Sequence, residues 1–237
     1  MIKRIIILVT LVHLSVCVKA QFFRGFGFFV GGTSSSHRYI NKLDVDSFGF
    51  AHTIPAPSHR SAEYLSYSGG IFAEFLPYDR IRWQTEIEYC TKGAKERPLL
   101  IPWPAVRGDM TANIYRNIEW NNFIKIFGNE GYRGTPYLML GARLDYNFAR
   151  SISAYSAVAD SYKKIRVTPD VGVGYEFVSY SKWHFFVEGH YNPDLLRKQI
   201  GNVSFFGRMF ELRVGLIFRP RKAIDDCNAP RYYGPNY

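Results

Sequence analysis

A strict two-residue alternation of apolar and polar side chains recurs along most of the chain, and it constrains the fold more than any other feature. In the stretch 210–218 the apolar parity holds Phe210, Leu212, Val214, Leu216 and Phe218, and the other parity holds Glu211, Arg213, Gly215 and Ile217. Successive side chains of a β-strand point to opposite faces, so such a stretch predicts a strand with one apolar and one polar face.

Eight stretches show this alternation strongly or weakly. They are 26–33, 64–76, 80–89, 118–127, 138–148, 170–177, 183–191 and 210–218. Their lengths suit the roughly 9–11 tilted residues that cross a bilayer as a strand. The connections alternate between long and short, for example 34–62 and then Pro77-Tyr78-Asp79. This alternation is typical of an antiparallel up-and-down β-barrel whose two ends face different compartments.

The alternation alone leaves open which parity faces outward. In a soluble barrel of the lipocalin kind, the apolar parity would line a cavity for a hydrophobic ligand. In a membrane barrel the apolar parity faces lipid. Three features favour the membrane: the apolar parity is nearly unbroken, glycines gather on the polar parity, and aromatic residues lie towards strand ends, as in an interfacial girdle. The girdle residues are Tyr67, Tyr89, Trp120, Tyr146, Tyr175, Trp183 and Tyr191.

The polar parity carries charges of both signs at similar depth. We expect ten of them to form a paired structural network inside the barrel: Arg80, Arg82, Glu86, Glu88, Arg143, Asp145, Glu176, Glu188, Glu211 and Arg213. An eight-stranded barrel encloses a space that side chains fill, and unpaired charges there would be costly. The predicted fold is therefore an all-β, eight-stranded antiparallel transmembrane barrel with a filled polar interior and no open pore.

The two ends of the chain differ from the barrel region. Residues 1–20 have a basic start, an apolar run of 14 residues from Ile5 to Val18, and small residues at a cleavage site after Ala20. This is the layout of a signal peptide. The barrel is expected over 21–218, and the polar segment 219–237 is expected to be a periplasmic tail. Of the cysteines that remain, Cys90 and Cys227, free thiols are favoured over a bridge.

Several segments resemble the PorT-like outer-membrane β-barrel family of Bacteroidota. The segment Thr135 to Tyr146 resembles the family's "PYLxxGxRLDY" strand, Val171 to Glu176 its Gly-rich sixth strand, and Phe186 to Leu195 its "xxExxYNxDL" segment. Phe210 to Phe218 is similar to its closing strand. The resemblance covers about 25–218. It implies an outer-membrane barrel, and because the family includes a subunit of type IX secretion, it admits a role in that apparatus.

Catalytic and cofactor chemistry find little support in the sequence. His184, Glu188 and His190 share one parity, but along a strand they spread over about 20 Å, too far for one metal ion. His37, His52 and His59 lie with several serines in the first long connection, yet no Gly-x-Ser-x-Gly or His-Glu-x-x-His motif accompanies them. We therefore predict no catalytic, cofactor or metal site. An outer-membrane hydrolase or acyltransferase is kept as an alternative.

The remaining expectations concern partners. The formal net charge is +10, but the basic residues are scattered and the protein is expected to be exported, which excludes nucleic acid. The long connections 34–62 and 93–117 mix basic and aromatic residues, among them Lys92 and Lys95 at the edge of the second. They are candidates for binding lipopolysaccharide or a protein. The sequence thus predicts a structural, adhesive or accessory-subunit protein of the Gram-negative outer membrane, in contact with its lipid.

Overall fold

The computed structural model describes residues 23–41, 59–76, 78, 80–96, 99–101, 106–107, 109–129, 134–153, 164–177, 182–193, 198–200 and 203–219. The predicted signal peptide 1–20 and all of the predicted tail except Arg219 lie outside these residues, as does Cys227. Among the described residues, no helix is long and apolar enough to cross a membrane.

Eight long antiparallel strands form the wall of a barrel. They are β1 (Phe23–Asn41), β3 (Tyr64–Phe75), β4 (Ile81–Glu96), β7 (Thr111–Phe127), β8 (Gly134–Ser151), β9 (Ile165–Phe177), β10 (Trp183–Pro193) and β12 (Val203–Phe218). Each strand pairs with the next long strand along the chain, and β12 pairs with β1 over the register Phe26↔Phe218 to Asn41↔Val203. The sheet is therefore closed, and the prediction of an eight-stranded up-and-down barrel is confirmed.

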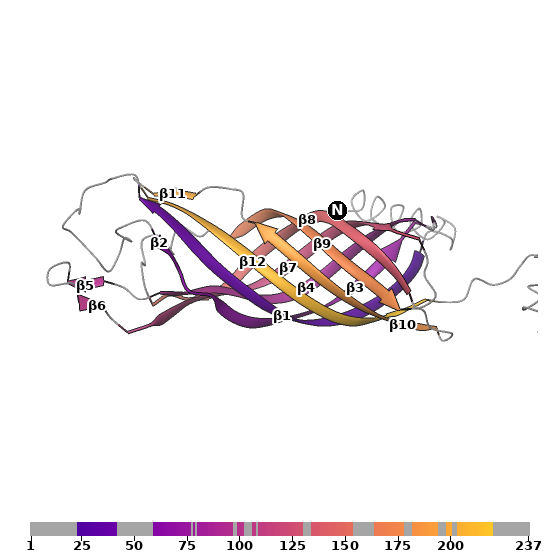
Figure 1. Ribbon diagram of the computed structural model, residues 1–237, viewed down its shortest axis with the longest axis horizontal. Coiled ribbons are helices and arrows are strands. Elements are labelled where there is room, and N and C mark those ends of the chain that lie inside the picture. Colours follow the sequence, from indigo (N-terminus) through magenta and orange to yellow (C-terminus); the bar gives the residue numbers. More distant parts are fainter. Residues whose placement is uncertain are drawn as a thin grey trace, which may run out of the picture.

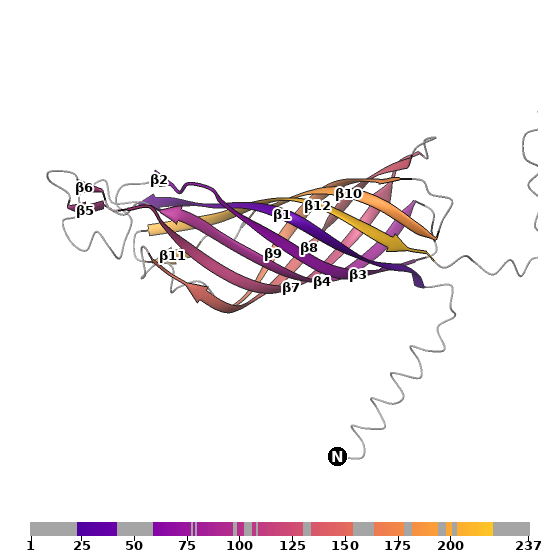
Figure 2. The ribbon, with the colours of Figure 1, turned by 90° about the horizontal axis from the view of Figure 1, so that it is seen from below.

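The strands tilt strongly against the long axis of the molecule, with β1 and β12 side by side (Figure 1). Four short strands lie at the end where the predicted long connections gather: β2 (His59–Arg60), β5 (Leu99–Ile101), β6 (Val106–Arg107) and β11 (Lys198–Ile200). Within the described part of the chain, β5 and β6 pair only with each other, beyond the end of the barrel wall (Figure 2). We call this the long-loop end and the opposite end the short-turn end.

The apolar parity faces outward and the charged parity faces inward. Phe28, Val30, Ile71, Leu212 and Val173 are exposed on the outside. Their sequence neighbours Phe29, Phe72, Arg213 and Gly172 are buried. This orientation is that of a transmembrane barrel and the reverse of the lipocalin alternative, in which the apolar side chains would line a cavity.

Several strands extend beyond their predicted ends towards the long-loop end. The segments 93–96 and 111–117 were expected in a connection, but they are paired, for example Gly93↔Ile114 and Lys95↔Ala112. Likewise β1 continues from Ser34 to Asn41. In these extensions polar side chains occur on both faces, since Ser35 points inward and Ser34 and Arg38 point outward, and the inward face mixes them with Tyr39 and Tyr115. The period-two contrast that marks a strand in sequence is therefore lost there.

Aromatic residues gather on the outer surface, as expected for a girdle. At the short-turn end the ring of Phe218 lies 5.3 Å from that of Phe26 and 5.1 Å from that of Trp183. One predicted girdle residue differs, because Trp120 lies in the middle of β7. Its indole Nε1 donates a hydrogen bond of 2.8 Å to Thr85 Oγ1, which satisfies the polar end of the ring within the apolar band.

Candidate functional site: a lumen of paired charges

The interior of the barrel is built by the inward parity of all eight long strands. Two apolar clusters lie among the charges: Phe29, Phe72, Phe186 and Ile217, and Phe123, Phe127, Tyr137 and Met139. The glycines of this parity make room for them. An added Cβ at Gly215 would lie 2.4 Å from Phe186 Cζ, and one at Gly174 would lie 2.4 Å from the ring of Tyr137. Small residues on the inward face therefore let large side chains from other strands fill the lumen.

Arg143, from β8, is the centre of the charge network. Its Nε lies 2.7 Å from Asp170 Oδ2 on the neighbouring β9, and its Nη2 lies 2.8 Å from Glu211 Oε2 on β12. Its Nη1 lies 3.2 Å from Glu88 Oε2 and 3.4 Å from Glu119 Oε2. The side chain is fully buried. One guanidinium thus joins carboxylates from four other strands, which requires it to reach across the barrel interior.

Arg213, from β12, completes the central layer. Its Nη1 and Nη2 lie 2.9 Å from Glu86 Oε2 and 2.6 Å from Glu88 Oε2, both on β4. Its guanidinium carbon lies 4.3 Å from the centroid of the Phe29 ring. Charge-assisted hydrogen bonds of this length are roughly twice as strong as neutral ones. Glu88 therefore accepts from both Arg143 and Arg213, and Glu211 also pairs with both, since its Oε1 lies 2.8 Å from Arg213 Nε.

A second layer lies on the long-loop side of the centre. Lys92 Nζ lies 2.7 Å from Glu119 Oε1 and 3.0 Å from Asp145 Oδ2. Arg166 Nη2 lies 2.8 Å from the same Asp145 oxygen. Lys92 was expected at the edge of a solvated connection, but it lies in β4 and points inward, because that strand continues further than its apolar pattern indicated.

A third layer closes the short-turn side. Arg82 and Arg219 both lie beside Glu176 Oε2, at 3.1 Å and 2.7 Å. Arg219 Nη2 also lies 3.0 Å from Glu74 Oε2. Arg219, the first residue after β12, thus contributes its side chain to this layer.

Lys125 links the third layer to the centre. Its Nζ lies 2.9 Å from Glu188 Oε1 and 3.4 Å from Glu74 Oε1. The same Glu188 oxygen accepts a 2.7 Å hydrogen bond from the Tyr137 hydroxyl.

The structure brings nine of the ten predicted network residues together in the lumen, all of them buried: Arg82, Glu86, Glu88, Arg143, Asp145, Glu176, Glu188, Glu211 and Arg213. Arg80 differs from the prediction. It is exposed and lies in a bend before Ile81, where its backbone carbonyl accepts a hydrogen bond from the Phe127 amide. Its parity agrees with the network, but the strand begins one residue later.

The network also includes residues that the prediction of ten did not name: Glu74, Lys92, Glu119, Lys125, Arg166, Asp170, His190 and Arg219. Four of them could have been predicted to face the lumen, because they alternate with apolar residues in the predicted strands: Glu74, Glu119, Lys125 and Asp170. For Arg166, no alternating stretch was recognised before residue 170, although β9 begins at Ile165.

The histidines act as hydrogen-bonding groups in the lumen. His190 Nδ1 lies 2.8 Å from Asp170 Oδ1, and its Nε2 lies 3.3 Å from Glu188 Oε2. His184 Nδ1 lies 3.1 Å from Glu176 Oε1. A histidine between two carboxylates has the chemistry of a general base. The His190 side chain is fully buried.

One group of side chains has ligand atoms close enough to hold a metal ion. Atoms of Glu88, Cys90 and Glu119 all lie within 4.8 Å of one another. The carboxylates are already engaged by Arg143, Arg213 and Lys92. A cation placed among three resident cations would be repelled, so these acids serve the network. The Cys90 thiol is free and buried, with its Sγ 3.8 Å from Met209 Sδ.

Comparison with known proteins gives structural likeness without sequence likeness. No protein-family model matches the chain, and no curated protein matches it. The Neisserial surface protein A has 13% sequence identity and a TM-score of 0.42, with 81% of this chain and 97% of that one covered. The outer membrane protein OprG from Pseudomonas aeruginosa has 9% identity and a TM-score of 0.49, covering 85% and 99%. The outer membrane protein AlkL has 12% identity and a TM-score of 0.47, with 86% of this chain and 95% of that one covered. Identities this low concern the fold alone.

Proposed function

We propose that the protein is a non-conducting outer-membrane barrel whose role is structural, adhesive or that of an accessory subunit, with its long-loop end outside the cell. Its barrel anchors and presents the long connections. The lumen carries no reaction and no flow of solute. The segment before the barrel has the layout of a signal peptide, which accords with export, and the short-turn end then faces the periplasm.

The observation that carries this proposal is the contact of Arg143 with carboxylates on β4, β7, β9 and β12. A pore would need a water-filled path along the axis, whereas Arg143, Arg213 and Glu119 have no exposed surface in the middle of the barrel. Breaking up such a network to open a path would leave several buried charges unpaired, at a cost of several kcal/mol.

Membership of the PorT-like family stays a prediction from the sequence, and with it a role in type IX secretion. Crosslinking from the long connections, or from the segment 220–237, would identify an accessory role by its partner. A member of a secretion complex would be recovered with the same partner proteins in repeated preparations. A protein with a purely structural role would be recovered alone or with lipid.

The test of the proposed location and fold is a gel of isolated outer membranes with and without boiling. A closed barrel resists SDS until it is heated, so the unboiled protein is expected to migrate differently from the boiled protein in the outer-membrane fraction. Recovery in the soluble periplasmic fraction, with no difference on boiling, would contradict the proposal.

A further inference from the structure

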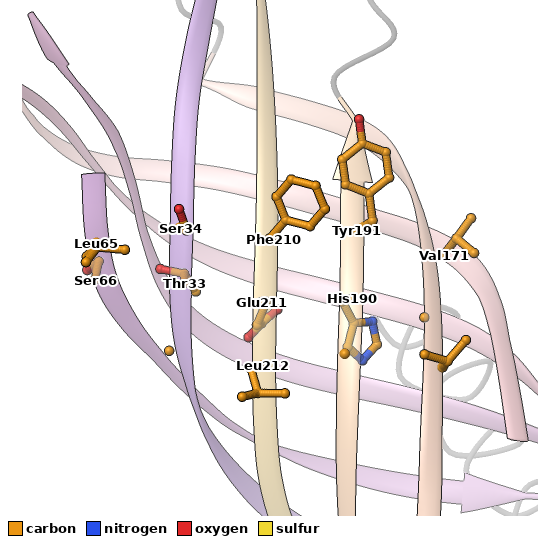
Figure 3. Close-up of a pocket in the computed structure, with 14 residues that line it drawn as sticks. Thr33, Ser34, Leu65, Ser66, Val171, His190, Tyr191, Phe210, Glu211 and Leu212 are labelled. Carbon is orange, nitrogen blue, oxygen red and sulfur yellow. The ribbon is translucent and has the colours of Figure 1, made fainter. Parts of the chain in front are cut away.

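An open depression of about 690 Å³ lies on the lipid-facing side of the wall, over the adjacent strands β3, β1, β12, β10 and β9. Figure 3 shows its lining, with Leu65 on β3 at one side and Val171 on β9 at the other. Leu212 lies between them on β12. The surface of this groove is almost entirely apolar. An acyl chain therefore fits its floor better than water or a polar ligand.

Two outward-facing glycines create the groove. Gly32 on β1 and Gly189 on β10 line it, and an added Cβ at either position would meet no heavy atom within 4 Å. In contrast, a Cβ at the inward-facing Gly141 would lie 2.1 Å from the Asn122 carbonyl oxygen. Packing of the barrel therefore requires a small residue at Gly141 but not at Gly32 or Gly189. The groove therefore exists because the sequence has glycine at these two positions, and not because the packing of the barrel requires it.

The groove ends in aromatic rings towards the long-loop end. The rings of Tyr191 and Phe210 lie side by side on β10 and β12, with centroids 4.7 Å apart (Figure 3). The guanidinium carbon of Arg208 lies 5.9 Å from the centroid of the Phe210 ring. Its Nε donates a 3.0 Å hydrogen bond to Ser36 Oγ on β1. A cation held by Ser36 thus lies beside the aromatic ring that ends the groove.

Cations outnumber acids around Arg208. Arg60 and Arg208 each approach Glu63 Oε1 at 3.4 Å, and the other Glu63 oxygen accepts a hydrogen bond from Ser34. Arg38 is exposed on the same outer face and is paired in register with Arg60. Among the described side chains here, Arg60 and Arg208 share the carboxylate of Glu63, and Arg38 adds a third guanidinium group to the same face. An anionic group placed beside Arg208 would offset this excess of positive charge, and guanidinium groups recognise phosphate well.

We propose that the groove binds one molecule of a phosphorylated, multiply acylated glycolipid of the outer leaflet, with the chemistry of lipid A. Its acyl chains lie over Gly32 and Gly189, and a phosphate lies against Arg208 and Arg60. The inference rests on the proposed function, because it requires the long-loop end to be outside the cell. A second copy of the chain suits the surface less well: a twofold contact here would bring Arg208 close to the partner's Arg208, and like charges oppose such an interface.

Native mass spectrometry of the folded barrel in mild detergent tests this directly, with lipid A as the probe and dephosphorylated lipid A and phosphatidylglycerol as comparisons. The wild-type protein is expected to retain one lipid A and to prefer it to both comparison lipids. Arg208→Gln should weaken retention on the order of tenfold, through loss of a charge-assisted contact. Gly189→Leu and Gly32→Leu place a side chain in the groove at positions where a Cβ meets no heavy atom within 4 Å, and each should weaken it at least as much.

Two matched controls use exposed residues of the opposite wall. Arg116→Gln removes an outward arginine of β7, and Ala142→Leu adds an outward side chain to β8. Neither should change retention. The inference is overturned if the groove variants retain lipid A as the wild type does, or if all three lipids are retained equally. It is also overturned if wild type is a dimer that Gly189→Leu separates, which would make a second copy the occupant.

The gel shift on boiling separates this inference from the proposed function. A protein that shifts in outer-membrane fractions but retains no lipid A contradicts only the groove assignment. A protein without the shift contradicts the location and fold as well.

Discussion

Arg143 Nη2, on β8, lies 2.8 Å from Glu211 Oε2, on β12, although two other strands, β9 and β10, separate these strands in the sheet. The contact therefore crosses the lumen instead of following the wall. Together with Arg213, which reaches Glu86 and Glu88 on β4, it joins distant sides of the barrel. Such cross-links make the interior a single network, and the consequences can be measured.

Removal of the central cation should destabilise the barrel strongly. Arg143→Met keeps most of the side-chain volume but leaves Asp170 without its arginine and Glu211 with Arg213 alone. Loss of one partner of a buried ion pair costs about 3–5 kcal/mol. The free energy of unfolding, measured by urea titration in lipid vesicles, should fall by about that amount. The exposed Arg116→Met is the matched control and should change it by less than about 0.5 kcal/mol. Equal effects would contradict the network.

Lys125 and Glu188 should be energetically coupled. Their Nζ–Oε1 distance is 2.9 Å and both are buried, so Lys125→Met and Glu188→Gln should each destabilise the protein. The double variant removes both charged groups, so neither is left buried without the other. Its loss should be smaller than the sum of the single losses, with a coupling energy of about 0.5–3 kcal/mol in a double-mutant cycle. Additive losses would show that the pair makes no direct contribution.

The inward glycines should tolerate substitution much less than the outward ones. Gly141→Ala would place a Cβ 2.1 Å from the Asn122 carbonyl oxygen and 2.5 Å from Phe123 Cδ1. A cost of about 1–3 kcal/mol is expected from such overpacking. Gly189→Ala meets no atom within 4 Å and should be near neutral. The two variants are compared by the temperature at which the unboiled gel band disappears, which should be lower for Gly141→Ala. A lower temperature for Gly189→Ala would contradict the assignment of inward and outward faces.

Cys90 should be protected from water-soluble maleimide in the folded barrel. Its side chain is fully buried, so labelling is expected only after unfolding. The test uses a Cys227→Ser background, which leaves Cys90 as the only thiol of the chain without its signal segment. Met110→Cys in a Cys90→Ser, Cys227→Ser background provides an accessible thiol for comparison, because Met110 is exposed near the long-loop end. Rapid labelling of Cys90 in the folded state would mean that water reaches the lumen.

Much of the fold follows from one property of the sequence. Residue parity predicted the eight strands, and it placed Glu88, Arg143 and Arg213 on the inward side, where the structure has them. Parity describes one strand at a time. The partners across the lumen depend on the stagger between strands and on barrel closure, which the sequence pattern does not encode. For that reason the alternation predicted that Arg143 is paired but not that it meets Glu211.

The errors at strand ends have a related cause. Arg80 continues the polar parity into the turn before β4, so the pattern extended the strand by one residue. Lys92 illustrates the opposite error, because β4 continues above the apolar band, where Thr91, Lys92 and Gly93 are all buried. Where apolar contrast ends, strand pairing continues with backbone hydrogen bonds and polar side-chain contacts such as that of Ser35 Oγ with Gly93, and sequence alternation no longer marks it.

The central claim is that the lumen is filled by paired charges and does not conduct. The most direct measurement is the electrical conductance of the purified, heat-modifiable barrel in a planar lipid bilayer. No stepwise conductance above that of the protein-free bilayer is expected, even at high salt. Discrete, reproducible conductance steps from the folded protein would contradict the account, because ions cannot pass Arg143 and Arg213 in the arrangement described.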